Sequence, residues 1–281
     1  MKNMLADEIL REGNPKEALA KLQDQVRKTP SNPEYRTFLF QLLSVLGEWD
    51  RAMNQLNVVA ELDDGTLAMV QTYREALRCE ALRTEIFNGA RTPLLFGQPQ
   101  EWVALMAEAL RLTAEGKIAE SQEIRNKAFE AAPATNGTID GVPFSWIADA
   151  DGRLGPILEA VINGQYYWVP LHQIRTINIE EPADLRDIVW MPAYFTWSNG
   201  GETVGLIPTR YPETQTSEDP LLLMSRKTEW IDKGTDLYLG LGQRMLTTDT
   251  ADYPLMDIRE IKLDSAEAAG ESVTEQIEAE E

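Results

Sequence analysis

Apolar residues recur at helical spacing through the first half of the chain. One stripe comprises Tyr35, Phe38, Leu39, Leu42, Leu43 and Leu46, and a second comprises Met53, Leu56 and Val59. Spacings of three and four residues place side chains on one side of an α-helix. The pattern predicts a succession of helices, each with one stripe buried in a core.

The helical pattern repeats along the sequence. An offset of 34 residues, the tetratricopeptide period, relates three pairs of residues: Gly13 and Gly47, Ala18 and Ala52, and Leu22 and Leu56. Thr66–Pro99 fits as a degenerate unit that starts with a long helix to about Phe87. Gly116 then precedes Pro133 by the interval that separates Gly13 from a helix-ending proline. Residues 1–132 are therefore predicted to form a tetratricopeptide-like helical domain.

Local signals mark where these helices begin and end. Gly13 and Gly47 permit the left-handed backbone that terminates a helix. Asn14 and Asn32 each precede a proline, which is the signature of a capped helix start. We expect helices to begin directly after both asparagines.

The second half of the chain has the pattern of short β-strands. Residues 133–141 are rich in proline, glycine and asparagine and are predicted to be a linker. Branched and aromatic residues then gather in runs at Phe144–Asp149, Ile157–Ile162, Gln165–Leu171, Ile174–Ile179, Ala193–Ser198 and Glu202–Ile207. Asn163-Gly164 is a two-residue hairpin signal, and Asn199-Gly200-Gly201 is a looser one.

Residues 142–263 are accordingly predicted to form a small, tryptophan-rich antiparallel β domain, barrel-like in shape. A short helix at Pro220–Ser225 and closing strands at Arg244–Thr247 and Leu255–Leu263 complete it. Residues 264–281 are small or acidic with almost no large apolar side chain, so we expect a disordered acidic tail. The fold class is α+β, with a helical repeat domain in front of the sheet.

Charge and cysteine content narrow the function. The chain of 281 residues has 46 acidic and 26 basic residues, giving a formal net charge of −20. Its scattered lysines and arginines do not form the basic face that nucleic acid or a membrane surface requires. One cysteine allows no internal disulfide, and neither an export signal nor a run of 18 apolar residues is present. These features favour a cytoplasmic protein with protein partners.

Few residues suited to catalysis are available. The chain has one histidine, His172, and one cysteine, Cys79, so we expect no metal site and no cofactor. Asp149, Asp151 and Arg153 form the sharpest local motif. They could centre an enzyme or small-ligand site, but Arg153 occupies the position where a calcium loop needs an oxygen ligand. The structural alternative is a turn in which the aspartates cap the backbone and Arg153 pairs with one of them.

Aromatic side chains of the β half provide the candidate binding surface. They are Tyr166, Trp168, Trp190, Tyr194 and Trp197. Tryptophan and tyrosine dominate protein interfaces, so an exposed aromatic face on the sheet would bind a partner. Packing in the core is the alternative for most of them.

An ordered series of motifs gives the chain a family resemblance. The helical repeats are followed by Asp149-x-Asp151-x-Arg153-x-Gly155-Pro156 within Trp146–Glu159, then by Trp190-Met191-Pro192-Ala193, Asn199–Glu202, Arg210-Tyr211-Pro212 and Thr228-Glu229-Trp230. From about Met1 to Leu263 the sequence resembles the ImpE family, whose members are also called SciE or TagJ.

The resemblance implies a non-enzymatic accessory protein of bacterial type VI secretion. It implies binding to the N-terminal helix of the small contractile-sheath subunit, and a role in sheath recycling by a AAA+ ATPase. A helix docking on a helical repeat fits this expectation. The family brings no catalytic residues to carry over. Two alternatives remain: an enzyme or ligand-binding module centred on Asp149, Asp151 and Arg153, and a structural bridge whose two domains hold different partners.

Overall fold

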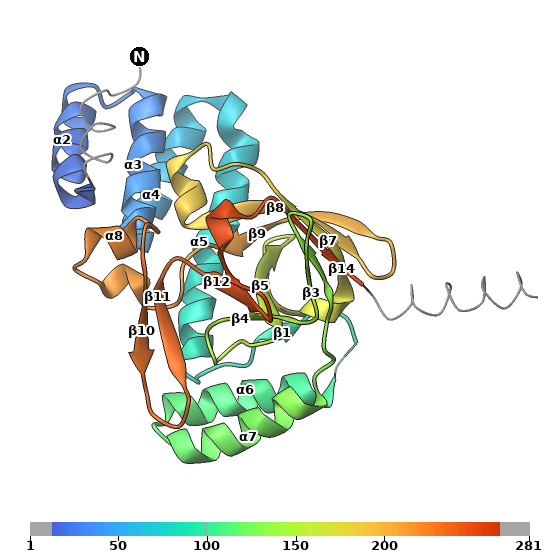
Figure 1. Cartoon of the computed structure of the whole chain (residues 1–281). Coiled ribbons are helices and arrows are strands. Elements are labelled where there is room, and N and C mark those ends of the chain that lie inside the picture. The colour runs from blue at the N-terminus through green and yellow to red at the C-terminus, as the bar shows by residue number, and fades with distance from the viewer. Residues whose placement is uncertain (1–12, 99, 265–281) are drawn as a thin grey trace, which may run out of the picture.

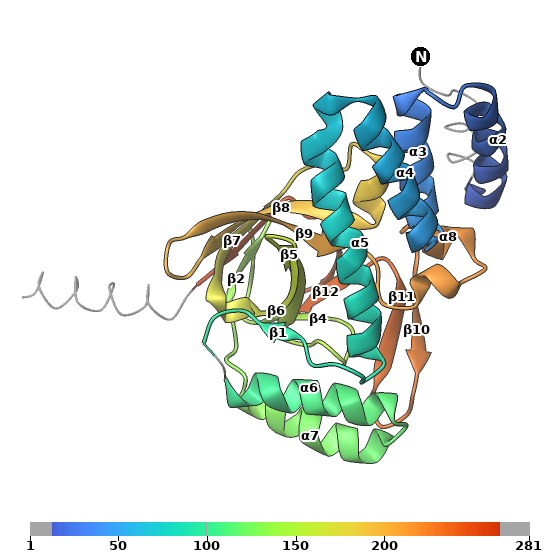
Figure 2. The ribbon, with the colours of Figure 1, turned by 180° about the vertical axis from the view of Figure 1, so that it is seen from behind.

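Helices occupy two sides of a curled sheet. The computed structural model describes residues 13–98 and 100–264. In chain order, the longer helices are α2 (Pro15–Lys28), α3 (Pro33–Val45), α4 (Trp49–Leu62), α5 (Leu67–Phe87), α6 (Glu101–Ala114) and α7 (Ile118–Ala131). Figures 1 and 2 show α2, α3 and α4 at one end of the molecule and the α6–α7 hairpin at the other, with α5 running alongside the sheet between them.

The predicted helix boundaries of the first repeat are confirmed. The Asn14 side chain accepts a hydrogen bond from the Glu17 N–H at 3.1 Å, and Asn32 accepts one from the Tyr35 N–H at 3.0 Å. Gly13 and Gly47 have φ of +87° and +71°, so both adopt the left-handed conformation expected of them. The long helix of the degenerate unit ends at Phe87, as predicted.

In the part of the chain that the structure describes, nine strands form the main sheet, in the order β1-β6-β5-β9-β8-β7-β14-β2-β3. Their bounds are β1 (Leu94–Leu95), β2 (Gly137–Ile139), β3 (Val142–Phe144), β5 (Ile157–Ile162), β6 (Gln165–Pro170), β7 (Ile174–Ile179), β8 (Trp190–Trp197), β9 (Glu202–Pro208) and β14 (Glu260–Leu263). Every neighbouring pair is antiparallel except β1 and β6. The predicted antiparallel sheet is thus confirmed, and the helical segment contributes its edge strand β1.

Two features of the sheet correct the sequence prediction. The sheet curls but is not a closed barrel, because in the described residues its edge strands β1 and β3 do not pair with each other. Residues 133–141 are not only a linker, because strand β2 lies within them and pairs with β14 and β3. Pairing with β14, more than 100 residues away in sequence, makes this strand invisible to local patterns. The predicted acidic tail begins at Asp264, and its residues 265–281 lie outside the described part.

Two smaller sheets and a short helix make up the rest of the described β half. Strand β12 (Met245–Thr248) pairs with β4 (Ile147–Asp149) and β13 (Asp252–Pro254). Strand β10 (Thr228–Asp232) pairs with β11 (Tyr238–Gly242) to form a ribbon on one flank of the molecule (Figure 1). The short helix α8 (Pro220–Leu223) falls where Pro220–Ser225 was predicted. Five 3₁₀ turns are described: η1 (Asp64–Thr66), η2 (Leu171–Gln173), η3 (Leu185–Ile188), η4 (Thr214–Thr216) and η5 (Leu255–Asp257).

Both faces of the central strands are buried. On β5, Leu158, Ala160 and Ile162 point into an inner core enclosed by the curled sheet. Ile157 and Val161 point the other way, into a core shared with the helices. This helix–sheet core unites residues from α2 through α7 with β5, β6, β8 and β9. The helical and β halves therefore share one hydrophobic core.

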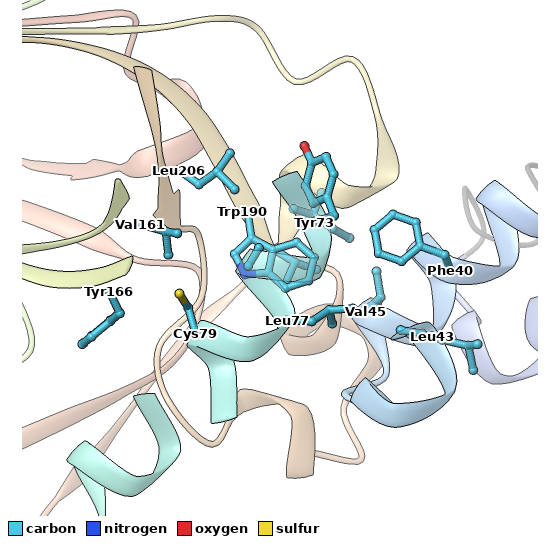
Figure 3. Packing of buried hydrophobic residues seen from close by; sticks show 14 of the residues in the cluster. Phe40, Leu43, Val45, Tyr73, Leu77, Cys79, Val161, Tyr166, Trp190 and Leu206 are labelled. Carbon is cyan, nitrogen blue, oxygen red and sulfur yellow. The ribbon is translucent and has the colours of Figure 1, made fainter. Parts of the chain in front are cut away.

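Trp190 is the clearest example of that shared packing. Its side chain is fully buried and reaches from β8 toward α5, as Figure 3 shows. Its ring centroid lies 5.8 Å from that of Tyr73 and 6.0 Å from that of Trp49. Truncating a buried tryptophan to alanine typically destabilises a protein by about 3–5 kcal/mol. Contacts of this kind hold the helices on the sheet.

Candidate functional site

The motif at residues 149–153 forms a buried turn. The Asp149 carboxylate accepts a hydrogen bond from the Asp151 N–H at 2.8 Å, and the Asp151 carboxylate accepts one from the Arg153 N–H at 2.9 Å. The Arg153 guanidinium also donates to both Asp151 oxygens, at 2.9 and 2.6 Å. All three side chains are buried. These are the backbone caps and the bidentate pair of the structural interpretation.

The same turn holds the β10–β11 ribbon in place. The Asp151 carboxylate accepts a further hydrogen bond from the Gly240 N–H at 2.8 Å, and the Gly152 N–H donates to the Tyr238 carbonyl at 3.2 Å. Gly240 and Tyr238 belong to β11. The motif therefore fixes a strand that is almost 90 residues away in sequence.

A buried network of charges continues from Asp149. Glu159, on β5, is completely buried and lies between two arginines. Arg83 of α5 donates to its two carboxylate oxygens at 2.6 and 2.9 Å. Arg244, also fully buried, bridges Glu159 and Asp149 with two further charged hydrogen bonds. Helix α5, strand β5 and the Asp149 turn are thereby joined by ion pairs inside the protein.

The network sets the ionisation of its two carboxylates. Burial by itself would raise the pKa of Glu159, but the Arg83 and Arg244 guanidiniums outweigh burial and hold that pKa at about 2. Burial raises the pKa of Asp149 to about 6, and the charge of Arg244 opposes the rise. Glu159 is therefore the firmly ionised member of the network.

Aromatic and arginine side chains complete the polar core. The Tyr166 hydroxyl donates to Glu159 at 2.5 Å, and the Trp168 indole N–H donates to the Tyr166 oxygen at 3.0 Å. Arg210 is buried and donates to the carbonyls of Val45, at 2.7 Å, and Leu223, at 2.8 Å. Val45 and Leu223 are the last residues of α3 and α8, where unpaired carbonyls and the helix dipole favour a cation.

The burial of the motif does not favour the ligand-binding alternative. The two aspartate carboxylates and the Arg153 guanidinium are engaged in the hydrogen bonds described above and are buried. A small pocket nearby, between α5 and residues 212–215, is lined partly by Glu80 and Arg83. Both already have partners, since the Trp190 indole N–H donates to Glu80 at 3.0 Å and Arg83 binds Glu159. Within residues 13–98 and 100–264, no cluster of histidine, cysteine, aspartate or glutamate could hold a metal ion.

The aromatic surface expected from the sequence does not form, because four of its five residues are buried. Tyr166, Trp168 and Trp190 are completely buried and Trp197 is 5% exposed, so none of these four presents a surface. The first three lie in the helix–sheet core, and Trp197 lies in the inner core. Alternation along a strand puts side chains on one face, but it does not reveal that helices cover that face.

Tyr194 is the exposed member of the predicted set. Its side chain is 47% exposed, and its direct cross-strand partner on β9, Val204, is 57% exposed. Its hydroxyl donates to Glu180 at 3.2 Å. Tyr194 and Val204 lie on the outer face of the sheet, and we call them the Tyr194–Val204 surface.

The single histidine and cysteine are both partly or fully buried. His172 is half-buried in η2 and lies 3.0 Å from the Gln100 side-chain nitrogen, and burial lowers its pKa. The Cys79 thiol faces the β5–β6 hairpin, where it donates to the Gly164 carbonyl at 3.5 Å. Burial raises the pKa of Cys79 to about 12, which makes its thiol unreactive at neutral pH.

Sequence reasoning missed the central residues of the charge network, Arg83, Glu159 and Arg244. Glu159 did carry a signal, because it is the one charged residue in the otherwise apolar strand Ile157–Ile162. A charge inside a fully buried strand requires a partner. The partners lie 76 and 85 residues away, and nothing in the sequence identifies them.

Fold and site together define a class: a tetratricopeptide-like helical protein joined to a β-sheet by a shared core and buried ion pairs. Two protein families match parts of this chain. Residues 10–77 match the family described as tetratricopeptide repeat, and residues 141–262 match the one described as ImpE protein. A protein of Pseudomonas aeruginosa named type VI secretion system accessory component TagJ is 51% identical over 265 residues, covering 94% of this chain and 93% of that protein. The chain belongs to the ImpE family.

A solved structure shows the same fold. The crystal structure of protein VPA1032 from Vibrio parahaemolyticus has a TM-score of 0.84 against this chain at 24% sequence identity, covering 93% of this chain and 98% of the other. The arrangement of helices and sheet therefore recurs in a distant protein. The family resemblance read from the sequence motifs is confirmed by the family match and by the 51% identical relative. Among the described residues, no helix has the length and apolar character needed to cross a membrane.

Proposed function

We propose that this chain is a cytoplasmic accessory adaptor of a type VI secretion system. In this proposal it binds the N-terminal helix of the small contractile-sheath subunit and assists recycling of the sheath by the AAA+ ATPase. The observation that carries the proposal is the 51% identity, over nearly the whole of both chains, to a protein named as an accessory component of that system. The buried and internally paired charges of the motif favour binding over catalysis.

The Tyr194–Val204 surface is our proposed docking position for the helix. Its two apolar side chains are about half exposed and stand side by side on the sheet. An amphipathic helix could lay its apolar face across them, because exposed aromatic and branched residues supply the anchors of such interfaces. The competing position is the α4–α5 junction, where Leu62 and Leu67 are 38% and 49% exposed.

Calorimetry with the full-length protein and a synthetic peptide of the sheath subunit's N-terminal helix tests the proposal. We expect saturable binding by the wild-type protein. The double variant Tyr194→Ser, Val204→Thr should weaken the affinity at least about tenfold, the usual loss when an interface anchor is removed. Tyr238→Ser serves as the matched control, because Tyr238 is equally exposed, at 47%, but lies on β11.

Three outcomes separate the possibilities. Absence of binding by the wild-type protein contradicts the sheath-helix function. Unchanged affinity in the Tyr194–Val204 variant, together with weakened affinity in Leu62→Ser, Leu67→Ser, moves the helix to the α4–α5 junction. If Tyr238→Ser loses as much affinity as the Tyr194–Val204 variant, the loss is not specific to the Tyr194–Val204 surface, and this docking position is contradicted.

A further inference from the structure

The Tyr194–Val204 surface has an exposed carboxylate at each of two opposite corners. Strand β9 places Glu202 two residues before Val204, and residues two apart on a strand share a face. Glu180 directly follows β7 and accepts a hydrogen bond from the Tyr194 hydroxyl at 3.2 Å, so its carboxylate lies on the same outer face. Both glutamates are exposed, and the apolar pair is therefore flanked by two carboxylates in contact with solvent.

The strand register places Tyr194 midway between these two glutamates. Glu202 is paired with Thr196 of β8, two residues from Tyr194. On the other side, Asn178 of β7 is paired with Tyr194 and lies two residues before Glu180. Strands are about 4.8 Å apart and rise about 3.4 Å per residue, so the Cα atoms of Glu202 and Glu180 are separated by roughly 16 Å along a diagonal of the sheet.

Helices bound this diagonal on one side and leave the rest of it open. Leu206, the next residue of β9 on the same face after Val204, is buried in the helix–sheet core, and its cross-strand partner Pro192 is half-buried. Figures 1 and 2 show the hairpin of β8 and β9 extending beyond the helices. A helix lying along the diagonal therefore crosses exposed sheet and passes beside the covered corner.

The two glutamates are not neutralised by basic residues of the described chain. Among residues 13–98 and 100–264, no lysine or arginine forms an ion pair with Glu180 or Glu202. The basic residues of the neighbouring strands and of the loop after β7 are engaged elsewhere: Lys262 pairs with Glu260, Arg186 pairs with Asp184, and Arg175 donates to the Ser198 carbonyl. Both carboxylates are thus available to the cations of a partner.

We propose that the helix bound at this surface lies along the Glu202–Tyr194–Glu180 diagonal and carries one lysine or arginine for each glutamate. An α-helix rises about 1.5 Å per residue, so roughly 16 Å corresponds to about eleven residues, or about three turns. The two basic residues then share a side of the helix with apolar residues roughly four and seven positions after the first, which contact Tyr194 and Val204. This orientation and charge pattern rest on the proposed binding of the sheath-subunit helix and add to it.

Charge determines which helices fit this diagonal. An acidic residue at either end would face a carboxylate in a protein that already carries a net charge of −20. Like charges across an interface reject wrong partners, whereas opposite charges speed association and fix the register of the bound partner. The apolar pair supplies most of the affinity, and the two glutamates select the helix and its direction across the sheet.

Fluorescence anisotropy with the full-length protein and a labelled peptide of the sheath subunit's N-terminal helix tests the charge pattern. The double variant Glu180→Gln, Glu202→Gln should bind about fivefold more weakly at low salt, because two exposed ion pairs are lost. Raising the ionic strength to about 0.5 M should remove most of this difference, since salt screens exposed charges. The control Glu123→Gln, Glu130→Gln, on the exposed surface of α7, removes the same charge and should keep the affinity within about twofold.

Double-mutant cycles identify which residues of the peptide are paired. Each basic residue of the peptide is replaced by glutamine and measured against Glu180→Gln and Glu202→Gln separately. We expect one basic residue to couple to each glutamate by at least about twofold, and these two residues to stand about eleven positions apart.

The possible results distinguish this charge pattern from the function on which it rests. Absence of binding by the wild-type protein contradicts both. Binding that weakens in Tyr194→Ser, Val204→Thr but not in Glu180→Gln, Glu202→Gln leaves the sheath-helix function in place and overturns the charge pattern. An equal loss in the α7 control, or coupling of both glutamates to one basic residue of the peptide, also overturns it.

Discussion

Glu159 lies at the centre of the buried charge network. Its carboxylate lies between the guanidiniums of Arg83 and Arg244 and accepts a hydrogen bond from Tyr166. A buried charge is costly unless it is paired and hydrogen-bonded. Removing the carboxylate leaves two buried cations with fewer partners, and breaking a buried ion pair typically destabilises a protein by about 3–5 kcal/mol.

Glu159→Gln should therefore be strongly destabilising, and its effect should depend on pH. The pKa of Glu159 in the folded protein, about 2, lies below its ordinary value of 4.5. Its contribution to stability is fully present above pH 4.5 and is lost as the pH falls from 4.5 to about 2. That loss amounts to roughly 3 kcal/mol, since one pKa unit corresponds to about 1.4 kcal/mol.

Urea unfolding at a series of pH values measures this contribution. The gap in free energy of unfolding between wild type and Glu159→Gln should be largest above pH 4.5 and should narrow in more acidic solution. Asp149 has a raised pKa and so contributes in the opposite direction, and because the Glu159 charge is one cause of that rise, the substitution offsets a small part of the gap. Glu229→Gln, on the exposed surface, is the control. A constant gap, or one as small as that of the control, would contradict the role assigned to the network.

The element that most depends on a distant residue is the β10–β11 ribbon. Asp151 holds β11 through the Gly240 N–H, and Arg153 holds Asp151. An isolated two-stranded hairpin is marginally stable in water, so the ribbon requires this attachment. The motif that stood out in the sequence therefore acts as a structural clamp on a flank of the molecule.

Asp151→Asn should loosen the ribbon more than the main sheet. The substitution removes the charge that binds Arg153 and weakens the bond to Gly240. We expect the β11 amides to exchange with solvent at least about tenfold faster, while amides of β8 and β9 keep their protection. Mass-spectrometric hydrogen exchange can resolve the two regions. Asp249→Asn, which removes an exposed backbone cap at Ser145, provides the comparison. Uniform acceleration across all strands would show that Asp151 supports the whole fold instead.

Helices and strands could be predicted from the sequence where neighbouring residues alone determine them. The capped helices after Asn14 and Asn32, helix α5 ending at Phe87, and the hairpin at Asn163-Gly164 all follow from neighbouring residues. The ribbon was not predicted, because β11 contains two glycines and β10 two acids, which are poor strand signals. These strands exist because distant groups bond to them. The same reason hides β1 and β2, whose partners lie far along the chain.

The candidate site could be predicted only in part, because some of its contacts are local and others come from elements far away in sequence. Bonds between Asp151 and Arg153 are local, so the sequence indicated them. Burial of Trp168 and Trp190 results from α5 covering one face of the sheet, which no strand pattern reveals. Contacts with the helices distinguish the exposed Tyr194 from Tyr166, Trp168 and Trp190, whereas Trp197 lies on the opposite face of the sheet, in the inner core.

The whole molecule is held together by its shared helix–sheet core. Residues of every helix from α2 to α7 contribute to the same cluster as residues of β5, β6 and β8. Arg83 and Arg210 add polar contacts between the helices and the β half. We predict that the helical and β halves unfold in one cooperative transition, although the sequence suggests two domains divided near residue 132.

Labelling of Cys79 can test this cooperativity. The thiol lies between α5 and the β5–β6 hairpin, and burial raises its pKa to about 12, so a thiol reagent should reach it only when the core opens. Its labelling should rise with urea at the same midpoint as the loss of both helical and strand signals in circular dichroism. Labelling at a clearly lower urea concentration would show that the helices separate from the sheet first.

Recognition of the sheath subunit through its N-terminal helix is the central claim about function. Its most direct test is co-elution of this full-length protein with the purified small sheath subunit in size-exclusion chromatography, using the intact subunit and a version lacking only that helix. The account predicts a complex with the intact subunit and none with the shortened one. Complexes with both, or with neither, would contradict it.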